Sequence, residues 1–371
     1  MSEYQYYEFQ TIDRLLTADE QAEIKQLSSR VQLTPNRAVF LYNFGSFRGD
    51  PERVLTEYFD VMFYIANWGT WRLMFRFPQG ILDPSCFQPY DLPEAITITQ
   101  TSKSIVLDLE IHEEGGIGGW VEGEGWLPQL LPLRDALLSG DLRLLYLVWL
   151  RVAPALAGDV LDEDPVEPPI PPNLSQLSQP LKAFVELVDL DPDWIAAAAQ
   201  ASSSAQTPTE APLENWLSAL SAAEQQDFLL KLVRREPHVD LQLIHRLKEL
   251  AGAEQPVSQA AAGQRRLSEL EAIADVLRTT REQNERNAAR KKRIQYLEAL
   301  APKEAQTWKR VAELIDLKQA KPYDEATALL KDLRDLAEYQ GRSPEFIQRF
   351  EQLKSDYQNR PALIARLKAV R

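Results

Sequence analysis

Every second residue is apolar in two runs within the first 112 residues, and this alternation predicts β-strands. In residues 71–77, large apolar side chains alternate with Arg72, Met74 and Arg76, and residues 104–112 show the same pattern. Successive side chains of a strand point to opposite faces, so such runs are typical of an antiparallel sheet with one face toward water. Shorter strands are expected at residues 4–10, 37–44 and 96–98.

Helical spacing of apolar residues, together with capping residues, predicts helices between and after these strands. Residues 17–20 (Thr-Ala-Asp-Glu) form a capping-box pattern that opens the first helix. Residues 50–51 (Asp-Pro) open a second helix, which is expected to extend to about residue 68. Two more helices are expected at 127–138 and 141–152. These elements predict an α+β domain over residues 1–158, an antiparallel sheet with helices on one face.

The rest of the chain predicts helices and connections but no strand. All but three of the 15 glycines lie at or before Gly158, and Gly341 is the single glycine after residue 263. The predicted parts are a proline- and acid-rich linker or surface strap at 159–173, a short helical segment at 174–201, a flexible linker at 202–212 and a helical domain at 213–371. That last domain has no helix breaker between Gly263 and residue 300, so a long helix is expected at about 258–300. An all-α C-terminal region therefore follows the α+β domain.

The charge is distributed unevenly along the 371 residues, whose formal net charge is −14. Residues 1–160 carry 12 Lys and Arg against 22 Asp and Glu, and residues 161–260 carry 6 against 16. Residues 261–371 reverse the balance, with 23 basic against 17 acidic side chains. The acidic part should repel nucleic acid and anionic membranes, whereas a basic end indicates a segment directed at a partner.

The lack of a possible disulfide and of a signal peptide indicates where the protein is expected to be located. Cys86 is the only cysteine, so no disulfide can form within the chain. The N-terminus lacks the basic start and apolar run of a signal peptide, and the most apolar stretch, residues 142–156, is interrupted by Arg143, Arg151 and Pro154. We expect a cytoplasmic protein with no membrane segment.

One strand carries the candidate residues for catalysis. Asp108, Glu110 and His112 occupy alternate positions and so share the outer face of the predicted strand, and Glu113 follows them. Converging carboxylates and an imidazole suit a divalent metal or general acid–base chemistry. Cross-strand ion pairs with the arginines of residues 71–77 explain the same pattern without any chemistry.

The glycine-rich residues 113–126 carry the candidates for partner contact. An anion cradle would need glycine amides that lead into a helix, but Glu122 and Glu124 would repel a phosphate there. A hairpin turn or a contact loop that uses Trp120 and Trp126 is the better interpretation. Arg48, in another glycine-containing loop, has no structural role that the sequence explains, so it joins this set.

Sequence motifs for catalysis and cofactors are missing from the chain. It contains three histidines and no C-x-x-C, H-E-x-x-H, Walker A or dinucleotide-binding pattern. We therefore expect no cofactor and no metal site, and an enzymatic activity is not assigned.

Residues 278–293 form a basic segment with seven basic side chains and two glutamates. As a helix it would be positive on most faces and could follow a phosphate backbone. A solvated helix face, or contact with this protein's own acidic part, explains the charge equally well. The candidate nucleic-acid contacts in this segment are Arg281, Arg286, Arg290, Lys291, Lys292 and Arg293.

Four runs carry a resemblance to a known family. They are YQYYEFQTIDRLLTADEQ, GDPERVLTEYFDVMFYIANWGTWRLMFRFP, WVEGEGWLPQLLPLRDALLSGDLRLLYLVWL and VDLDPDWIAAAAQAS. Over about residues 1–200 the chain resembles a family of uncharacterised bacterial proteins that are often encoded beside a protein with a SWIM-type zinc finger. The resemblance implies a cytoplasmic bacterial protein that works with such a partner, and it assigns no catalytic residue.

Three functional hypotheses follow from the sequence. The leading one is a non-enzymatic interaction or scaffold protein in a bacterial multi-protein system, with a protein partner that could be a zinc-finger protein. The first alternative is a metal-dependent hydrolase or nuclease-like enzyme that uses the carboxylates of residues 108–114. The second is a nucleic-acid-associated factor that acts through residues 278–293.

Overall fold

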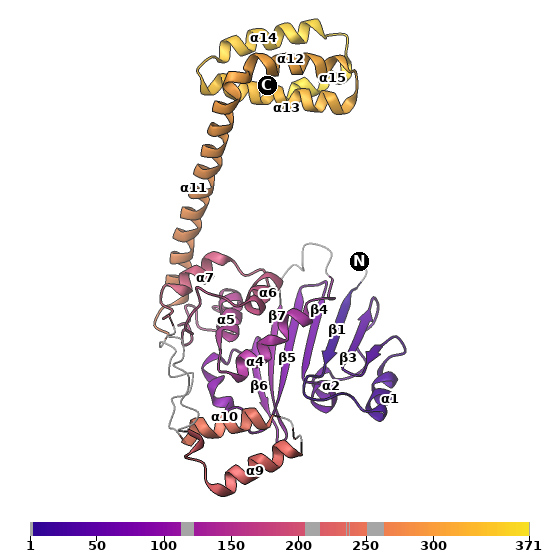
Figure 1. The fold of residues 1–371 in the computed structure, drawn as a ribbon, viewed down its shortest axis with the longest axis vertical. Helices are drawn as coiled ribbons and strands as arrows, with labels where there is room; N and C mark the ends of the chain where they lie inside the picture. Colours follow the sequence, from indigo (N-terminus) through magenta and orange to yellow (C-terminus); the bar gives the residue numbers. More distant parts are fainter. Residues whose placement is uncertain are drawn as a thin grey trace. The chain divides into compact units, whose positions relative to one another are not determined.

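The predicted fold class is confirmed in a computed structural model, which describes residues 3–112, 122–204, 216–234, 236, 238–250 and 263–370. A seven-stranded antiparallel sheet occupies residues 5–112, and a mostly helical region follows it (Figure 1). The strand order is β2-β3-β1-β4-β5-β7-β6. The strands are β1 (Gln5–Gln10), β2 (Gln32–Thr34), β3 (Arg37–Tyr42), β4 (Val61–Ala66), β5 (Thr70–Pro78), β6 (Ile96–Gln100) and β7 (Ser104–His112).

One face of the sheet carries the larger apolar core. Every second residue of β5 and β7, such as Leu73 and its cross-strand partner Leu109, is buried on this face. A layer of helices covers it (Figure 1). These are α3 (Leu127–Leu130), α4 (Pro132–Leu138), α5 (Arg143–Leu156), α6 (Gln179–Leu187) and α7 (Pro192–Ala199). Most residues of α5 are buried, which explains its apolar sequence.

Helices also lie on the second face, in addition to the layer that was expected. There α1 (Ala18–Leu27) and α2 (Pro51–Tyr58) contribute Ile24 and Leu55 to a smaller apolar cluster. The capping box at Thr17 is present, and the Asp50 carboxylate accepts hydrogen bonds from two backbone amides of α2. Met74 of β5 is buried in this cluster, so the second face is only partly open to water.

The helix expected to extend to residue 68 was wrong in its second half. It ends at Tyr58, and residues 61–66 form β4 instead. The reason is that β4 is buried on both faces: Phe63 belongs to the larger cluster and Met62 to the smaller one. A strand covered on both sides has a continuous apolar sequence, which cannot be distinguished from a helix by periodicity.

Residues 159–173 pack as a strap on the helical layer. Val166 pairs with Arg266 in an isolated β-bridge, and Glu167 is buried. Gly263 lies so close to the strap that an added Cβ would meet the Glu167 carbonyl oxygen at 1.9 Å. Because residues 263–266 are held in this way, the long helix α11 (Leu267–Leu300) begins after them rather than at about 258. Residues 258–262 lie outside the described residues, as do residues 205–212 of the expected flexible linker.

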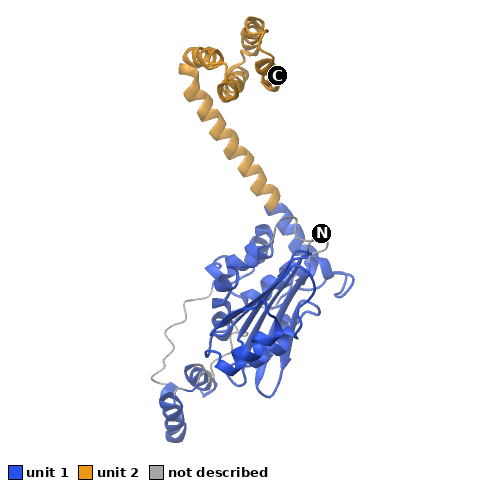
Figure 2. Ribbon diagram, turned by 90° about the vertical axis from the view of Figure 1, so that its right-hand side faces the viewer, with its two compact units in different colours: residues 1–277 blue, residues 278–371 orange. Residues whose placement is uncertain are grey.

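The chain divides into two compact units, residues 1–277 and 278–371 (Figure 2). The first unit joins the sheet and its helical layer, so residues 174–201 belong with the sheet. It also includes α9 (Ala222–Val233) and α10 (Val239–Leu250). The division therefore falls within α11 rather than near residue 158.

The C-terminal unit has an apolar core of its own. It contains the larger part of α11 together with α12 (Glu304–Asp316), α13 (Ala320–Tyr339), α14 (Ser343–Asp356) and α15 (Pro361–Leu367). Buried side chains such as Val311, Leu330 and Leu363 come from three different helices of this unit. In this unit, the apolar residues that recur at helical spacing are therefore the ones that form the buried core.

Candidate functional site

The carboxylates predicted for catalysis lie together on β7, as expected, but an arginine engages them. Arg72 of β5 donates from Nε to Asp108 Oδ1 at 2.9 Å and from Nη2 to Asp108 Oδ2 at 2.6 Å. Its Nε also lies 3.6 Å from Glu110 Oε2. Hydrogen bonding to Asp108 raises the pKa of Arg72 above its ordinary value, so the guanidinium stays charged. This arrangement is the cross-strand ion pair and leaves Asp108 poorly placed to bind a metal.

The remaining predicted catalytic residues do not complete a site. His112 contacts Glu110 at 3.3 Å through Nε2 and Thr70 Oγ1 at 3.2 Å through Nδ1, and its side chain is 61% exposed. Glu113 lies outside the described residues. Arg76, expected to pair with these carboxylates, forms its ion pair with Asp60 instead. Across the residues that the structure describes, no group of three His, Cys, Asp or Glu side chains could hold a metal ion.

The predicted partner-contact residues gather at the end of the sheet where β1 begins. The Tyr4 hydroxyl accepts a hydrogen bond from the Gly123 amide at 3.0 Å, and Gln5 Nε2 donates to the Gly45 carbonyl at 2.8 Å. These bonds fix residues 122–125 and 45–48 at the same sheet end. The exposed predicted residues there are Arg48, Glu122 and Glu124.

The two predicted tryptophans contribute differently from what was expected. Trp126 is partly buried against the larger apolar core, so its ring is only partly available to a partner. Trp120 lies outside the described residues. Sequence reasoning missed two exposed aromatic residues at the same sheet end: Phe44, which is 81% exposed, and Trp68, which is 45% exposed. Phe44 follows β3 and Trp68 follows β4. The ends of both strands pair with Gln5, the first residue of β1, and knowledge of this pairing would have placed both aromatic residues at this sheet end.

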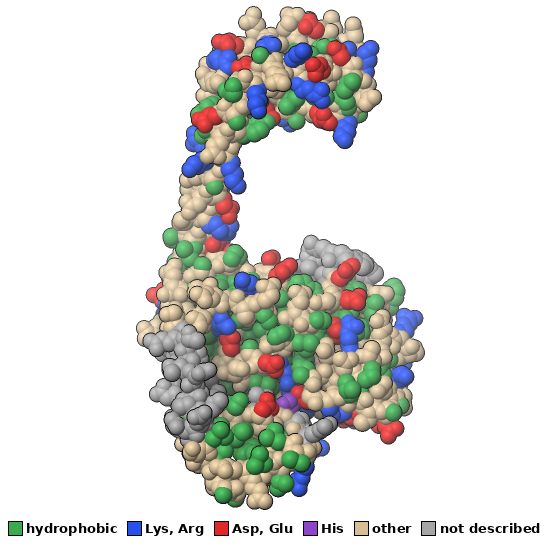
Figure 3. All heavy atoms as spheres, in the orientation of Figure 1, with side chains coloured by type: hydrophobic (Ala, Val, Ile, Leu, Met, Phe, Trp, Pro, Cys, Tyr) green, Lys and Arg blue, Asp and Glu red, His purple; other side chains and the backbone are tan. Residues whose placement is uncertain are grey.

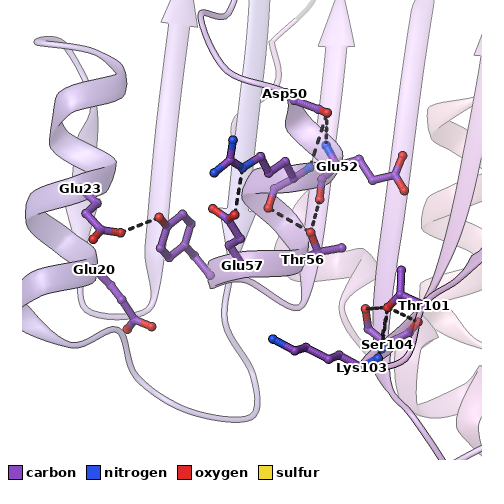
Figure 4. A pocket seen from close by; sticks show the side chains of 11 residues that line it. Glu20, Glu23, Asp50, Glu52, Thr56, Glu57, Thr101, Lys103 and Ser104 are labelled. Atoms are coloured by element: carbon purple, nitrogen blue, oxygen red, sulfur yellow. Dashed lines mark hydrogen bonds and ion pairs between the residues drawn. The ribbon is translucent and has the colours of Figure 1, made fainter.

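An open groove of about 990 Å³ lies at the other end of β7, between α1, α2 and the turn before Ser104 (Figure 4). Five carboxylates and two cations line it together with four uncharged polar side chains. The carboxylates are those of Glu20, Glu23, Asp50, Glu52 and Glu57, and the cations are Arg53 and Lys103. We call this the acidic groove.

Two carboxylates from α1 are fixed in position at the groove. Arg14 forms an ion pair with Glu20 at 2.6 Å, and this hydrogen bond lowers the pKa of Glu20 to about 2. Glu23 accepts a hydrogen bond from the Tyr58 hydroxyl at 2.6 Å, which raises the pKa of Tyr58 to about 12. Glu23 is exposed, so its carboxylate remains accessible from the groove.

The carboxylates from α2 differ in how far they are engaged. Asp50 caps the helix by accepting from the Glu52 amide at 3.0 Å, and Glu57 pairs with Arg53 at 2.9 Å (Figure 4). The Glu52 carboxylate and the Lys103 ammonium make no ion pair with any described residue. The groove therefore has a negative wall that is only partly neutralised, which suits a cationic ligand. Its members come from residues 20 to 104, which no local sequence pattern could have grouped.

Some of the cations in the basic segment of α11 form ion pairs with described residues, and others do not. Arg281 and Arg286 pair with glutamates four residues away, at 3.4 Å and 3.3 Å. Arg293 contacts Asp332 and Asp335 of α13 at 2.7 Å and 2.6 Å. The exposed cations without an ion pair to any described residue are Arg290, Lys291 and Lys292.

Comparison with models of protein families, with curated proteins and with solved structures gave no match to this chain. The resemblance to a bacterial family therefore stays a prediction. None of the helices within the described residues combines the length and the apolar character that crossing a lipid bilayer requires.

Proposed function

We propose that this protein is a non-enzymatic interaction protein whose acidic groove holds a basic segment of a protein partner. The observation that carries the proposal is the groove itself, where five carboxylates face two cations in an open volume of about 990 Å³. An open, charged groove on a rigid sheet and two helices favours a peptide segment over a small apolar ligand, since ligand pockets for the latter are mostly apolar.

Electrostatics supports a partner of the opposite sign. Arg14 holds Glu20 ionised, and the Glu23 and Glu57 carboxylates are exposed, so the wall is negative in the free protein. Complementary charge raises the rate of encounter and fixes the register of a bound segment. We propose that the partner belongs to a cytoplasmic bacterial system, and a SWIM-type zinc-finger protein is the partner that the family resemblance favours.

The direct test measures binding of a fluorescein-labelled Lys- and Arg-rich peptide to the full chain by anisotropy. The variant Glu23→Lys/Glu57→Lys reverses two exposed charges of the groove, and Asp162→Lys/Glu163→Lys applies the same charge change at the exposed start of the strap. We expect the groove variant to weaken binding about tenfold near 0.1 M salt because two close charge pairs are lost, whereas the strap variant changes it less than about twofold.

The salt dependence provides a second readout. Binding of the wild-type chain should weaken steadily with added salt, and the groove variant should show a smaller slope. Equal weakening by the groove and strap variants would mean that the peptide senses only the overall charge of the protein, and the groove would then have no role.

A second candidate function rests on the three free cations of α11. Arg290, Lys291 and Lys292 are exposed and unengaged by the described acidic residues, so they are available to phosphates. Replacing all three by Gln should lower the salt slope of binding to a short duplex DNA, with Lys309→Gln/Lys318→Gln/Lys321→Gln as a control of equal charge. A titration in which the wild-type chain and both variants give the same flat curve would remove this candidate.

A further inference from the structure

A buried cluster of charged side chains lies apart from the surfaces described above. The Asp13 carboxylate, in the loop after β1, receives a hydrogen bond from Arg134 Nη2 to Oδ2 at 3.0 Å, and Arg76 Nη2 lies 3.8 Å from the same oxygen. Asp60 pairs with Arg76 and accepts the backbone N–H of Ile12 at 2.6 Å. The Asp13 and Arg134 side chains are only 6% and 2% exposed. Two carboxylates and two guanidiniums leave this cluster neutral.

His238 reaches this cluster from a distant part of the sequence. Its Nε2 lies 2.6 Å from Asp13 Oδ2, although the geometry of this contact departs from that of a good hydrogen bond. Burial acts to raise the pKa of Asp13, but the contact with His238 and the charge of Arg134 outweigh it and lower that pKa. Asp13 therefore remains a carboxylate in the closed contact.

The backbone at His238 is strained. Its φ is +60°, in the left-handed region that residues other than glycine rarely adopt, and its carbonyl accepts the Gln242 amide at the start of α10. Such strain persists only where the surroundings impose it, and it is common at switch regions. Here the strain coincides with insertion of the imidazole into the cluster.

Little apolar surface supports this insertion. We call residues 216–250, with α9 and α10, the arm. Among its described residues, Leu220, Val239 and Leu247 are buried, and none of them belongs to an apolar cluster of the sheet. No residue of α9 is buried, and apolar side chains gather over α9 and α10 at the surface (Figure 3). Segments with few buried apolar contacts open at a small cost in free energy.

We propose that the arm is a releasable element and that the His238–Asp13 contact closes it on the sheet unit. Opening withdraws the imidazole but leaves Asp13 with Arg134, so the buried carboxylate keeps a cationic partner in both states. Opening also relieves the left-handed backbone of His238. A partner that binds the open arm would shift the population toward it. The proposal does not depend on the acidic groove.

Hydrogen exchange of the full chain tests the proposal. The variants are His238→Ala, which removes the imidazole, and His238→Asn, which keeps an amide donor and tolerates the left-handed backbone. The matched control is His112→Ala, because His112 is an exposed histidine that contacts a glutamate. We expect amides of α10 to exchange about tenfold faster in His238→Ala, corresponding to the loss of one contact with a buried carboxylate. Amides of the sheet should keep their rates.

The outcomes separate cleanly. Acceleration confined to α9 and α10, smaller in His238→Asn and absent in His112→Ala, supports the proposed closing contact. Unchanged exchange of α10 in His238→Ala would show that the imidazole does not hold the arm. Equal acceleration across the sheet strands would show that His238 is a structural part of the core. Each of these last two results would overturn the proposal.

Discussion

The two compact units use charge in different ways. In the first unit, carboxylates with almost no exposure are paired inside the structure: Glu167 with Arg265, Glu8 with Arg37 and Asp60 with Arg76. In the C-terminal unit, the described ion pairs lie at the surface, and Asp332, whose side chain is 20% exposed, is the least exposed carboxylate among them. Buried charges are costly unless fully paired, whereas surface pairs contribute little. The first unit thus combines its apolar cores with buried polar contacts at specific points, while apolar packing fills the interior of the second.

The largest effect should come from the clamp at the start of α11. Arg265 donates from Nε to Glu167 Oε1 at 2.7 Å and from Nη1 to the Ala197 carbonyl at 2.9 Å. Arg265→Met leaves the Glu167 carboxylate buried without its cationic partner, so we expect a loss of about 3–5 kcal/mol from the free energy of unfolding of the first unit. Urea unfolding followed by hydrogen exchange measures it. The double variant Glu167→Gln/Arg265→Met should recover part of the loss, and a double variant no better than the single one would contradict this account.

Shortening a buried side chain should show how strongly apolar packing stabilises the C-terminal unit. Leu330 of α13 is fully buried in the apolar cluster of the C-terminal unit. Leu330→Ala should lower the stability of that unit by about 2–5 kcal/mol, since both transfer energy and packing are lost. Exchange rates of α12–α15 report the change, and those of the sheet should stay constant. Comparable destabilisation of the sheet would show that the two units do not unfold independently.

Acid should test the ion pair at the acidic groove. Hydrogen bonds from Arg14 lower the pKa of Glu20 from its ordinary value of 4.5 to about 2. A group with a lowered folded-state pKa contributes stability above its unfolded pKa, and this contribution is lost as the pH falls from about 4.5 through about 2. Glu20→Gln should therefore flatten the decline of stability in this window, as followed by circular dichroism. If stability declined with pH at the same rate in the wild type and the variant, the Arg14–Glu20 ion pair would not be the source of the acid dependence.

The smallest effect should come from the surface pairs of α11. Arg286 and Glu282 lie 3.3 Å apart, and both side chains are largely exposed. Glu282→Gln should leave the denaturant midpoint of the C-terminal unit unchanged within error, since exposed pairs four residues apart contribute little to stability. A clear shift in the midpoint would mean that surface charge supports this unit after all.

Much of the fold was readable from local patterns. Alternation predicted β5 and β7 correctly because each has one face against the large core. Capping residues predicted the starts of α1 and α2. β4 was missed because burial on both faces removes the alternation on which the prediction depends. The start of α11 was missed because its cause is tertiary: the strap pairs with residues about 100 positions away.

The candidate surfaces were much harder to predict. The sequence placed Asp108 and Glu110 on one face, but only the strand order shows that Arg72 lies beside them. The acidic groove combines two helices and a turn that are far apart in sequence. The His238–Asp13 contact joins positions more than 200 residues apart, and no spacing rule can reveal such a pair.

The two-sided burial of β4 has a genetic consequence. All six of its residues are buried, and neighbouring positions face different cores. A one-residue deletion there would exchange the two sets of side chains between the cores, since register decides which face each residue occupies. A saturation library should therefore show six consecutive codons that reject every charged amino acid.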